Sequence, residues 1–95
     1  MEPRIQYAKA KDGVNIAYYT MGEGMPLVCL PDSTPHVQME WQFPRSRKWY
    51  EALARKRMLV CYDRRGSGLS ERDVTDYSLD VLVLDLEAVV DRLGL

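Results

Sequence analysis

The stretch of sequence that decides the fold is MLVCYDRRGSGLS, from Met58 to Ser70. Its first five residues form a short apolar run, which is typical of a strand that is buried on both faces of a sheet. The next eight residues, starting at Asp63, are polar and rich in glycine, and they indicate a tight turn that closes the strand. We therefore expect a central strand over residues 58–62 and a turn directly after it.

A second apolar run predicts a parallel neighbour for this strand. Residues 26–31 read PLVCLP, and the segment from Asp32 to Pro44 is interrupted by prolines, which predicts a loop. A helix capped by Ser46 is expected to follow and to end at about Lys56. Strand, helix and strand in this order predict a βαβ unit with a right-handed crossover.

The two ends of the chain predict a hairpin and a helix. Residues 5–10 and 14–20 are β-branched or aromatic and roughly alternating, and the Asp12-Gly13 pair between them favours a tight turn with positive φ. At the other end, Ser78 is a good N-cap for a helix that stops at Gly94. The apolar residues of this helix recur at three- and four-residue steps: Leu79, Leu82, Val83, Leu86, Val90 and Leu93.

Length and composition exclude several classes of protein. The 95 residues suffice for one small domain or a part of one, which excludes a two-domain enzyme. With 46% hydrophobic and 28% charged residues, the chain is neither disordered nor collagen-like. No apolar run approaches the roughly 18–20 residues of a membrane span, and the first residues lack the pattern of a signal peptide. We expect a cytoplasmic protein without a membrane partner.

Charge is distributed unevenly along the chain. Between Arg45 and Arg65 eight basic residues stand against two acids, whereas from Glu71 to Leu95 seven acids stand against two arginines. Such an asymmetry can mark a nucleic-acid surface, but no aromatic platform or recognition-helix pattern accompanies it. We therefore expect two solvated helix faces of opposite sign and no nucleic-acid partner.

The hairpin, the βαβ unit and the strand-end motif Asp63-x-Arg65-Gly66-x-Gly68-x-Ser70 together resemble the N-terminal part of the α/β-hydrolase fold. The acidic, leucine-rich helix before Leu95 supports the resemblance, which covers the whole chain. It implies an α/β protein with a partial α/β-hydrolase sheet: an antiparallel hairpin plus parallel strands, with one helix on each face. Residues 1–95 would form a single incomplete domain of this family, with its first four strands and two helices.

The resemblance also implies which functional residues to expect. In the family the nucleophile lies in a G-x-S-x-G elbow after the fifth strand, and an acid and a histidine follow. Residues 66–70 read G-x-G-x-S after the fourth strand, so no catalytic residue is assigned in this chain. The loop after the third strand donates a backbone N–H to the oxyanion hole in the family, and Ser33 is the candidate here. A simple turn organised by Asp32 and Ser33 is the alternative.

The implied function is that of a fragment of a hydrolase for ester-type or related small substrates, inactive alone because the nucleophile, the acid and the histidine are missing. The alternative is a non-catalytic, self-associating or protein-interaction module. A local triad of Asp32, Ser33 and His36 is disfavoured, because residues so close in sequence rarely adopt triad geometry. A dinucleotide fingerprint fails at Glu71, where its third glycine belongs.

The remaining candidate groups are cysteines and aromatic residues. Cys29 and Cys61 share no metal-ligand spacing with His36, the only histidine, so neither a metal nor another cofactor is expected. The family pairs the two cysteine-bearing strands, which allows a disulfide, but two core thiols fit a cytoplasmic protein better. Aromatic side chains could line a substrate mouth, although packing is the commoner role; these are Trp41, Phe43, Trp49 and Tyr50.

The sheet order of the family also predicts a partner surface. It places the fourth strand between the second and the third, which leaves the third strand as an edge. Natural proteins cover or pair such an apolar edge, so we expect self-association, most simply a two-fold homodimer that pairs third strand with third strand. The predicted edge residues are Leu27, Val28, Cys29 and Leu30.

Overall fold

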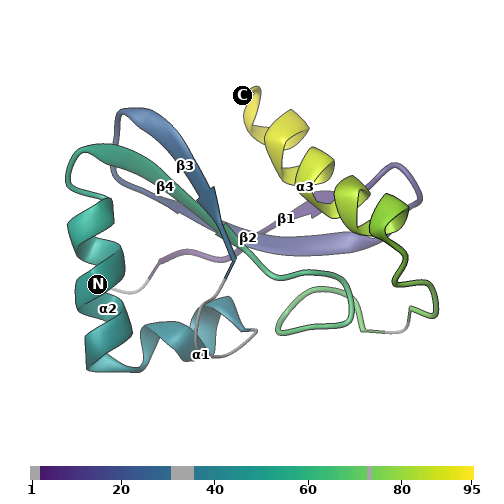
Figure 1. Ribbon diagram of the computed structural model, residues 1–95, viewed down its shortest axis with the longest axis horizontal. Helices are drawn as coiled ribbons and strands as arrows, with labels where there is room; N and C mark the ends of the chain where they lie inside the picture. Colours follow the sequence, from purple (N-terminus) through teal and green to yellow (C-terminus); the bar gives the residue numbers. More distant parts are fainter. Residues whose placement is uncertain (1–2, 31–35, 73) are drawn as a thin grey trace.

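The structure, a computed structural model, describes residues 3–30, 36–72 and 74–95. Its centre is a four-stranded sheet with the order β1-β2-β4-β3 (Figure 1). Strand β2 lies antiparallel to both β1 and β4, whereas β3 and β4 are parallel. The strands are β1 (Gln6–Lys9), β2 (Asn15–Met21), β3 (Met25–Cys29) and β4 (Arg57–Tyr62).

The N-terminal hairpin forms as the sequence predicts. Strand β1 pairs with β2 in a register that aligns Tyr7 with Ala17 and Lys9 with Asn15. The turn between the two strands places Gly13 at φ +92°, a region that disfavours side chains with a Cβ. The Asp12-Gly13 pair therefore fixes the register of the first two strands.

The connection from β3 to β4 differs from the predicted loop and single helix. Residues 37–41 form a short helix, α1 (Val37–Trp41), and Pro44 begins a second one, α2 (Pro44–Leu53). The prediction of a loop through to Pro44 is therefore wrong, because α1 buries the apolar side chains at both of its ends against the sheet. Ser46 is not the cap of α2, since proline fits the first helical turn, where its missing N–H costs no hydrogen bond.

The C-terminal helix α3 (Leu79–Leu93) has the predicted bounds, with Ser78 at the N-cap and Gly94 at φ +70° after its last turn. Its apolar residues do not all face the sheet. The buried positions are Asp85, Ala88 and Val89. Leucines and valines on the other side of the helix stay exposed, so the periodicity identified the helix but not which side packs.

Helices cover both faces of the sheet, α1 and α2 on one face and α3 on the other (Figure 1). The expectation of one helix on each face is corrected by the extra helix α1. Each face has its own apolar core. Ile16, Tyr18 and Val60 pack with Ala88 and Val89 of α3. On the opposite face, the core under α1 and α2 contains Tyr19, Leu59 and Cys61 with Val37, Trp41 and Tyr50. Among the described residues no helix is long and apolar enough to cross a membrane.

Candidate functional site

The carboxyl ends of the two parallel strands form the candidate site. In parallel α/β sheets ligands bind at this edge, because the loops that follow neighbouring strands meet there. Here β3 ends at Cys29 and β4 ends at Tyr62, and Cys29 lies opposite Cys61 in the register. The chain segments that follow these strands lead into α1 and into the turn over residues 63–70.

Asp63 joins the two segments. Its side chain is fully buried, and each of its carboxylate oxygens accepts one backbone hydrogen bond. Oδ1 accepts from the N–H of Val37 at 2.9 Å, and Oδ2 accepts from the N–H of Leu69 at 2.9 Å. Burial raises the pKa of Asp63, and the two N–H donors act against this rise. One carboxylate thus fixes the start of α1 and the end of the turn after β4.

The two glycines of the turn are required by close packing. Gly66 has φ +77° and Gly68 has φ +53°, both in the region that favours glycine. A Cβ at Gly68 would overlap the carboxylate of Asp63, and a Cβ at Gly66 would overlap the ring of Tyr77. Both glycines therefore allow the positive φ angles of a tight turn. Gly68 also leaves space for the carboxylate of Asp63 to bind Leu69.

Arg65 anchors the same turn to α3 and to the hairpin. Its Nε donates to Asp85 Oδ1 at 2.8 Å, and its backbone N–H donates to Asp85 Oδ2 at 3.0 Å. The two terminal nitrogens of Arg65 donate to the carboxylate of Asp12 at 2.7 and 3.2 Å. The hydrogen bond from Arg65 holds the pKa of Asp12 below its usual value. Arg65 and Asp85 are buried as an ion pair, and each has charged or backbone partners that offset its desolvation.

Ser70 is the last of the strand-end residues, and its hydroxyl forms two hydrogen bonds with backbone groups. Its hydroxyl donates to the carbonyl of Asp63 at 2.6 Å and accepts from the N–H of Ala17 at 2.8 Å. Ser70 thereby joins the turn to β2. A hydroxyl committed to these two bonds is not a nucleophile, in keeping with the G-x-G-x-S order of the segment.

The candidate oxyanion residue Ser33 lies outside the described residues, as does Asp32. Of the three residues of the disfavoured local triad, the structure describes His36 alone. His36 is the N-cap of α1, and its Nδ1 accepts from the N–H of Met39 at 3.0 Å. The side chain of His36 therefore caps the start of α1.

The two cysteines are free and adjacent. Cys29 Sγ and Cys61 Sγ lie 2.6 Å apart at the pairing of β3 with β4. No group of three or more metal-ligating side chains occurs in the part of the chain that the structure describes.

The four aromatic residues that could line a substrate mouth differ in exposure. Trp41 and Tyr50 belong to the core beneath α1 and α2, whereas Phe43 and Trp49 are exposed.

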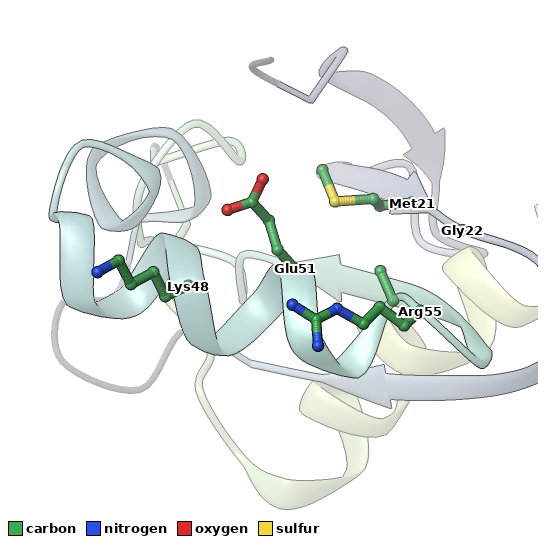
Figure 2. Close-up of a pocket in the computed structure, with 6 residues that line it drawn as sticks. Met21, Gly22, Lys48, Glu51 and Arg55 are labelled. Carbon is green, nitrogen blue, oxygen red and sulfur yellow. The ribbon is translucent and has the colours of Figure 1, made fainter.

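Of two depressions that the described residues line, the smaller one adjoins the strand-end turn. A depression of about 430 Å³ is lined by Tyr7, Asn15, Leu69 and Glu71, so it borders the turn that Asp63 organises. A larger one of about 610 Å³ lies between β2 and α2 (Figure 2). Its lining includes Gly22, which packs near the start of β4, so it is at the amino ends of the parallel strands and away from the candidate site.

Sequence reasoning found the strand-end motif but missed the partners that hold it. The sequence predicts a turn at Asp12 and a helix that includes position 85, yet Asp12 and Asp85 both bind Arg65. Asp85 gave no local signal, because the periodicity of the helix does not show which of its sides is buried. Asp12 gave none either, since an aspartate before glycine is already explained by the turn.

A sheet with this strand order, with helices on both faces and a polar turn after a central strand, defines an α/β protein of the hydrolase type. No protein-family model matches this chain. It is 33% identical over 92 residues to the bifunctional epoxide hydrolase 2 of Sus scrofa, a match that covers 94% of this chain and 16% of the relative.

Solved structures show the same fold. The esterase RhEst1 from Rhodococcus sp. ECU1013 superposes with a TM-score of 0.77 at 28% identity, over 95% of this chain and 32% of the esterase. An α/β hydrolase from Sphaerobacter thermophilus DSM 20745 superposes with a TM-score of 0.72 at 31% identity, over 94% of this chain and 32% of that protein. The chain has the fold of the α/β-hydrolases and matches one part of these longer proteins. It spans about a third or less of these relatives.

Proposed function

We propose that the chain forms one wall of the active site of a hydrolase that acts on an ester, an epoxide or a related small substrate. The observation that supports this most directly is the double hydrogen bond of Asp63. By holding Val37 and Leu69, Asp63 fixes both segments that flank the carboxyl ends of β3 and β4. A ligand site at this edge needs such rigid support, because catalytic geometry tolerates little displacement.

In this proposal the loop after β3 is the oxyanion loop, and the backbone N–H of Ser33 is its donor. The chain by itself contributes scaffold and no complete catalytic machinery, since Ser70 and His36 are engaged in structural hydrogen bonds. We also place the protein in the cytoplasm, where two free cysteines persist as thiols.

The first test is an assay of the purified chain on a small activated ester and on a small epoxide. We expect hydrolysis no faster than with the urea-unfolded chain at the same concentration. Turnover by the folded chain that disappears with Ser33→Ala would overturn the scaffold role, because it would show a complete active site within these residues.

A second test asks whether the scaffold supports catalysis. These residues would replace the matching part of the Rhodococcus esterase, and the folded chimera is expected to retain ester hydrolysis. Asp63→Ala in the chimera should lower the rate, whereas Phe43→Ala, at an exposed position, should not. A folded chimera without activity would contradict the proposal.

A second candidate function, a self-associating or interaction module, is favoured by the edge strand. Strand β3 has a single neighbour, β4, in the described sheet, and Met25 and Leu30 at its two ends are 69% and 41% exposed. Unpaired apolar edges are sites of strand pairing, so we propose a homodimer in which β3 pairs with β3, through Leu27, Val28, Cys29 and Leu30.

Light scattering tests the dimer. A charge directly beside an edge strand opposes pairing, so Leu30→Lys, at the residue after β3, is expected to give a monomer. The matched variant Tyr7→Lys, on the opposite edge strand β1, should leave the dimer intact. A folded monomer of the unmodified chain at low micromolar concentration would contradict the proposal, and dissociation by Tyr7→Lys alone would assign the contact to β1.

A further inference from the structure

The paired cysteines are close enough for a disulfide to form between them. Cys29 and Cys61 are direct partners in the parallel register of β3 and β4, and their sulfur atoms lie 2.6 Å apart. Neighbouring strands lie about 4.8 Å apart, within the range of about 4.4–6.8 Å between Cα atoms that disulfides span. The spacing of paired strands is therefore compatible with a bridge between these two residues.

The two thiols differ in environment, which gives them different roles. Cys29 lies on the edge strand and is partly exposed, whereas Cys61 is buried on the central strand. The hydrogen bond between the two side chains lowers the pKa of Cys29. The same hydrogen bond and burial raise the pKa of Cys61. Cys29 is therefore the thiol that ionises first and that a small oxidant can reach.

We propose that Cys29 and Cys61 are a reversible redox site, at which a hydroperoxide oxidises Cys29 and Cys61 resolves the product to a disulfide. In the first step the Cys29 thiolate attacks the terminal oxygen of the peroxide. An S–O bond forms, the O–O bond breaks, and the departing oxygen takes a proton to give water or an alcohol.

In the second step the sulfur of Cys61 attacks the sulfenic acid at Cys29. The S–S bond forms, the S–O bond breaks, and the hydroxide leaves as water with the proton of the Cys61 thiol. The two thiols lose two electrons and two hydrogen atoms in total, and the hydroperoxide accepts both. A dithiol reductant reverses the reaction.

The bridge would tie the edge strand to the centre of the sheet. It closes the chain over residues 30–60, which contain both α1 and α2. A cross-link of this kind restricts the unfolded chain and raises the temperature of unfolding. The inference is independent of the proposed hydrolase role, because it rests on the cysteine pair alone.

The experiment is a mass measurement on the reduced, purified chain. The folded protein is treated with hydrogen peroxide, denatured, alkylated and weighed intact. Because the sequence has only two cysteines, a monomer that is lighter by two hydrogen atoms and takes up no alkylating agent must hold the Cys29–Cys61 bond. We expect this species, its reversal by dithiothreitol, and formation at least about tenfold faster in the folded than in the urea-unfolded chain.

Single variants test the assigned order of attack. With Cys61→Ser, peroxide should leave a sulfenic acid at Cys29 that dimedone traps, whereas Cys29→Ser should give little trapping at the buried Cys61. Two alkylatable thiols in the peroxide-treated folded chain, oxidation to sulfinic acid without a bridge, or equal rates in the folded and unfolded chain would each overturn the proposal. If dimedone trapped the sulfenic acid mainly at Cys61, the assignment of Cys29 as the oxidised thiol and Cys61 as the resolving thiol would be wrong.

Discussion

Gly68 shows how closely the turn after β4 is packed at the scale of single residues. Gly68→Ala adds a Cβ at φ +53° that collides with the buried carboxylate of Asp63. We expect a loss of about 2–4 kcal/mol in the free energy of unfolding, from backbone strain and from displacement of Asp63. Gly94→Ala is the matched control, with φ +70° and open space around its Cβ, and should cost about 1–2 kcal/mol. Equal losses in urea denaturation would contradict the steric argument.

The two carboxylates that bind Arg65 should contribute unequally to stability. Asp85 is buried and accepts from both the side chain and the backbone of Arg65, so Asp85→Asn leaves a buried guanidinium poorly paired. We expect a loss of about 3–5 kcal/mol. Asp12 is 35% exposed, and water can replace it, so Asp12→Asn should cost about 1 kcal/mol or less. Urea denaturation near neutral pH measures both, and a larger loss for Asp12→Asn would refute this ranking.

The pairing of Asp12 with Arg65 also predicts a pH dependence. The folded protein holds the pKa of Asp12 below its ordinary value of 3.8, so the unfolded chain binds this proton more readily. The stabilisation is therefore complete above pH 3.8 and is lost as the pH falls through the folded pKa. The difference in unfolding free energy between the unmodified chain and Asp12→Asn should be constant near neutral pH and shrink in acid. A difference that grows in acid would contradict the ion pair.

At the scale of elements, the short helix α1 depends on contacts outside itself. A helix of five residues is not stable alone, and its start is held by His36 and by Asp63. Asp63→Ala should cost about 1–3 kcal/mol, because one buried and one partly buried N–H group lose their acceptor. Hydrogen exchange should speed up at Val37 and Leu69 but not within α3. His36→Ala removes one exposed cap and should accelerate exchange at Met39 only. Uniform acceleration across all elements would argue against a local role.

The elements differ in how far their sequence determines them. The hairpin, the parallel pair and the bounds of α3 were predictable, because the Asp12-Gly13 turn, two apolar runs and a terminal glycine are local signals. The helix α1 was not, since five residues are too few for helical periodicity to be recognised and the helix forms by burying Val37 and Trp41. The strand-end motif was predictable as a turn, but the reach of Arg65 to distant carboxylates is a tertiary contact without a local pattern.

At the scale of the whole molecule, the sheet divides the interior into two cores. Several apolar side chains belong to neither core and remain exposed. The core beneath α3 contains Ala88 and Val89, whereas the side of the same helix that carries Val83 and Leu86 is exposed. The sequence periodicity failed to choose the packing side because α3 has more apolar residues than its contact with the sheet requires. The hydrogen bond between Arg65 and Asp85 favours the rotation of α3 that places Asp85, Ala88 and Val89 against the sheet.

The uncovered side of α3 gives a test of this rotation. Val83 and Leu86 are 45% and 38% exposed, so the double variant Val83→Lys, Leu86→Lys should change the unfolding free energy by no more than about 1 kcal/mol. It should also lower the fluorescence of a dye that binds apolar surfaces. Val89→Ala, at a fully buried position one turn away, should cost about 2 kcal/mol, because it leaves a cavity against the sheet. If the lysine pair unfolded the protein while Val89→Ala did not, α3 would have to pack through its leucine side, and the Arg65–Asp85 pair could not fix its orientation.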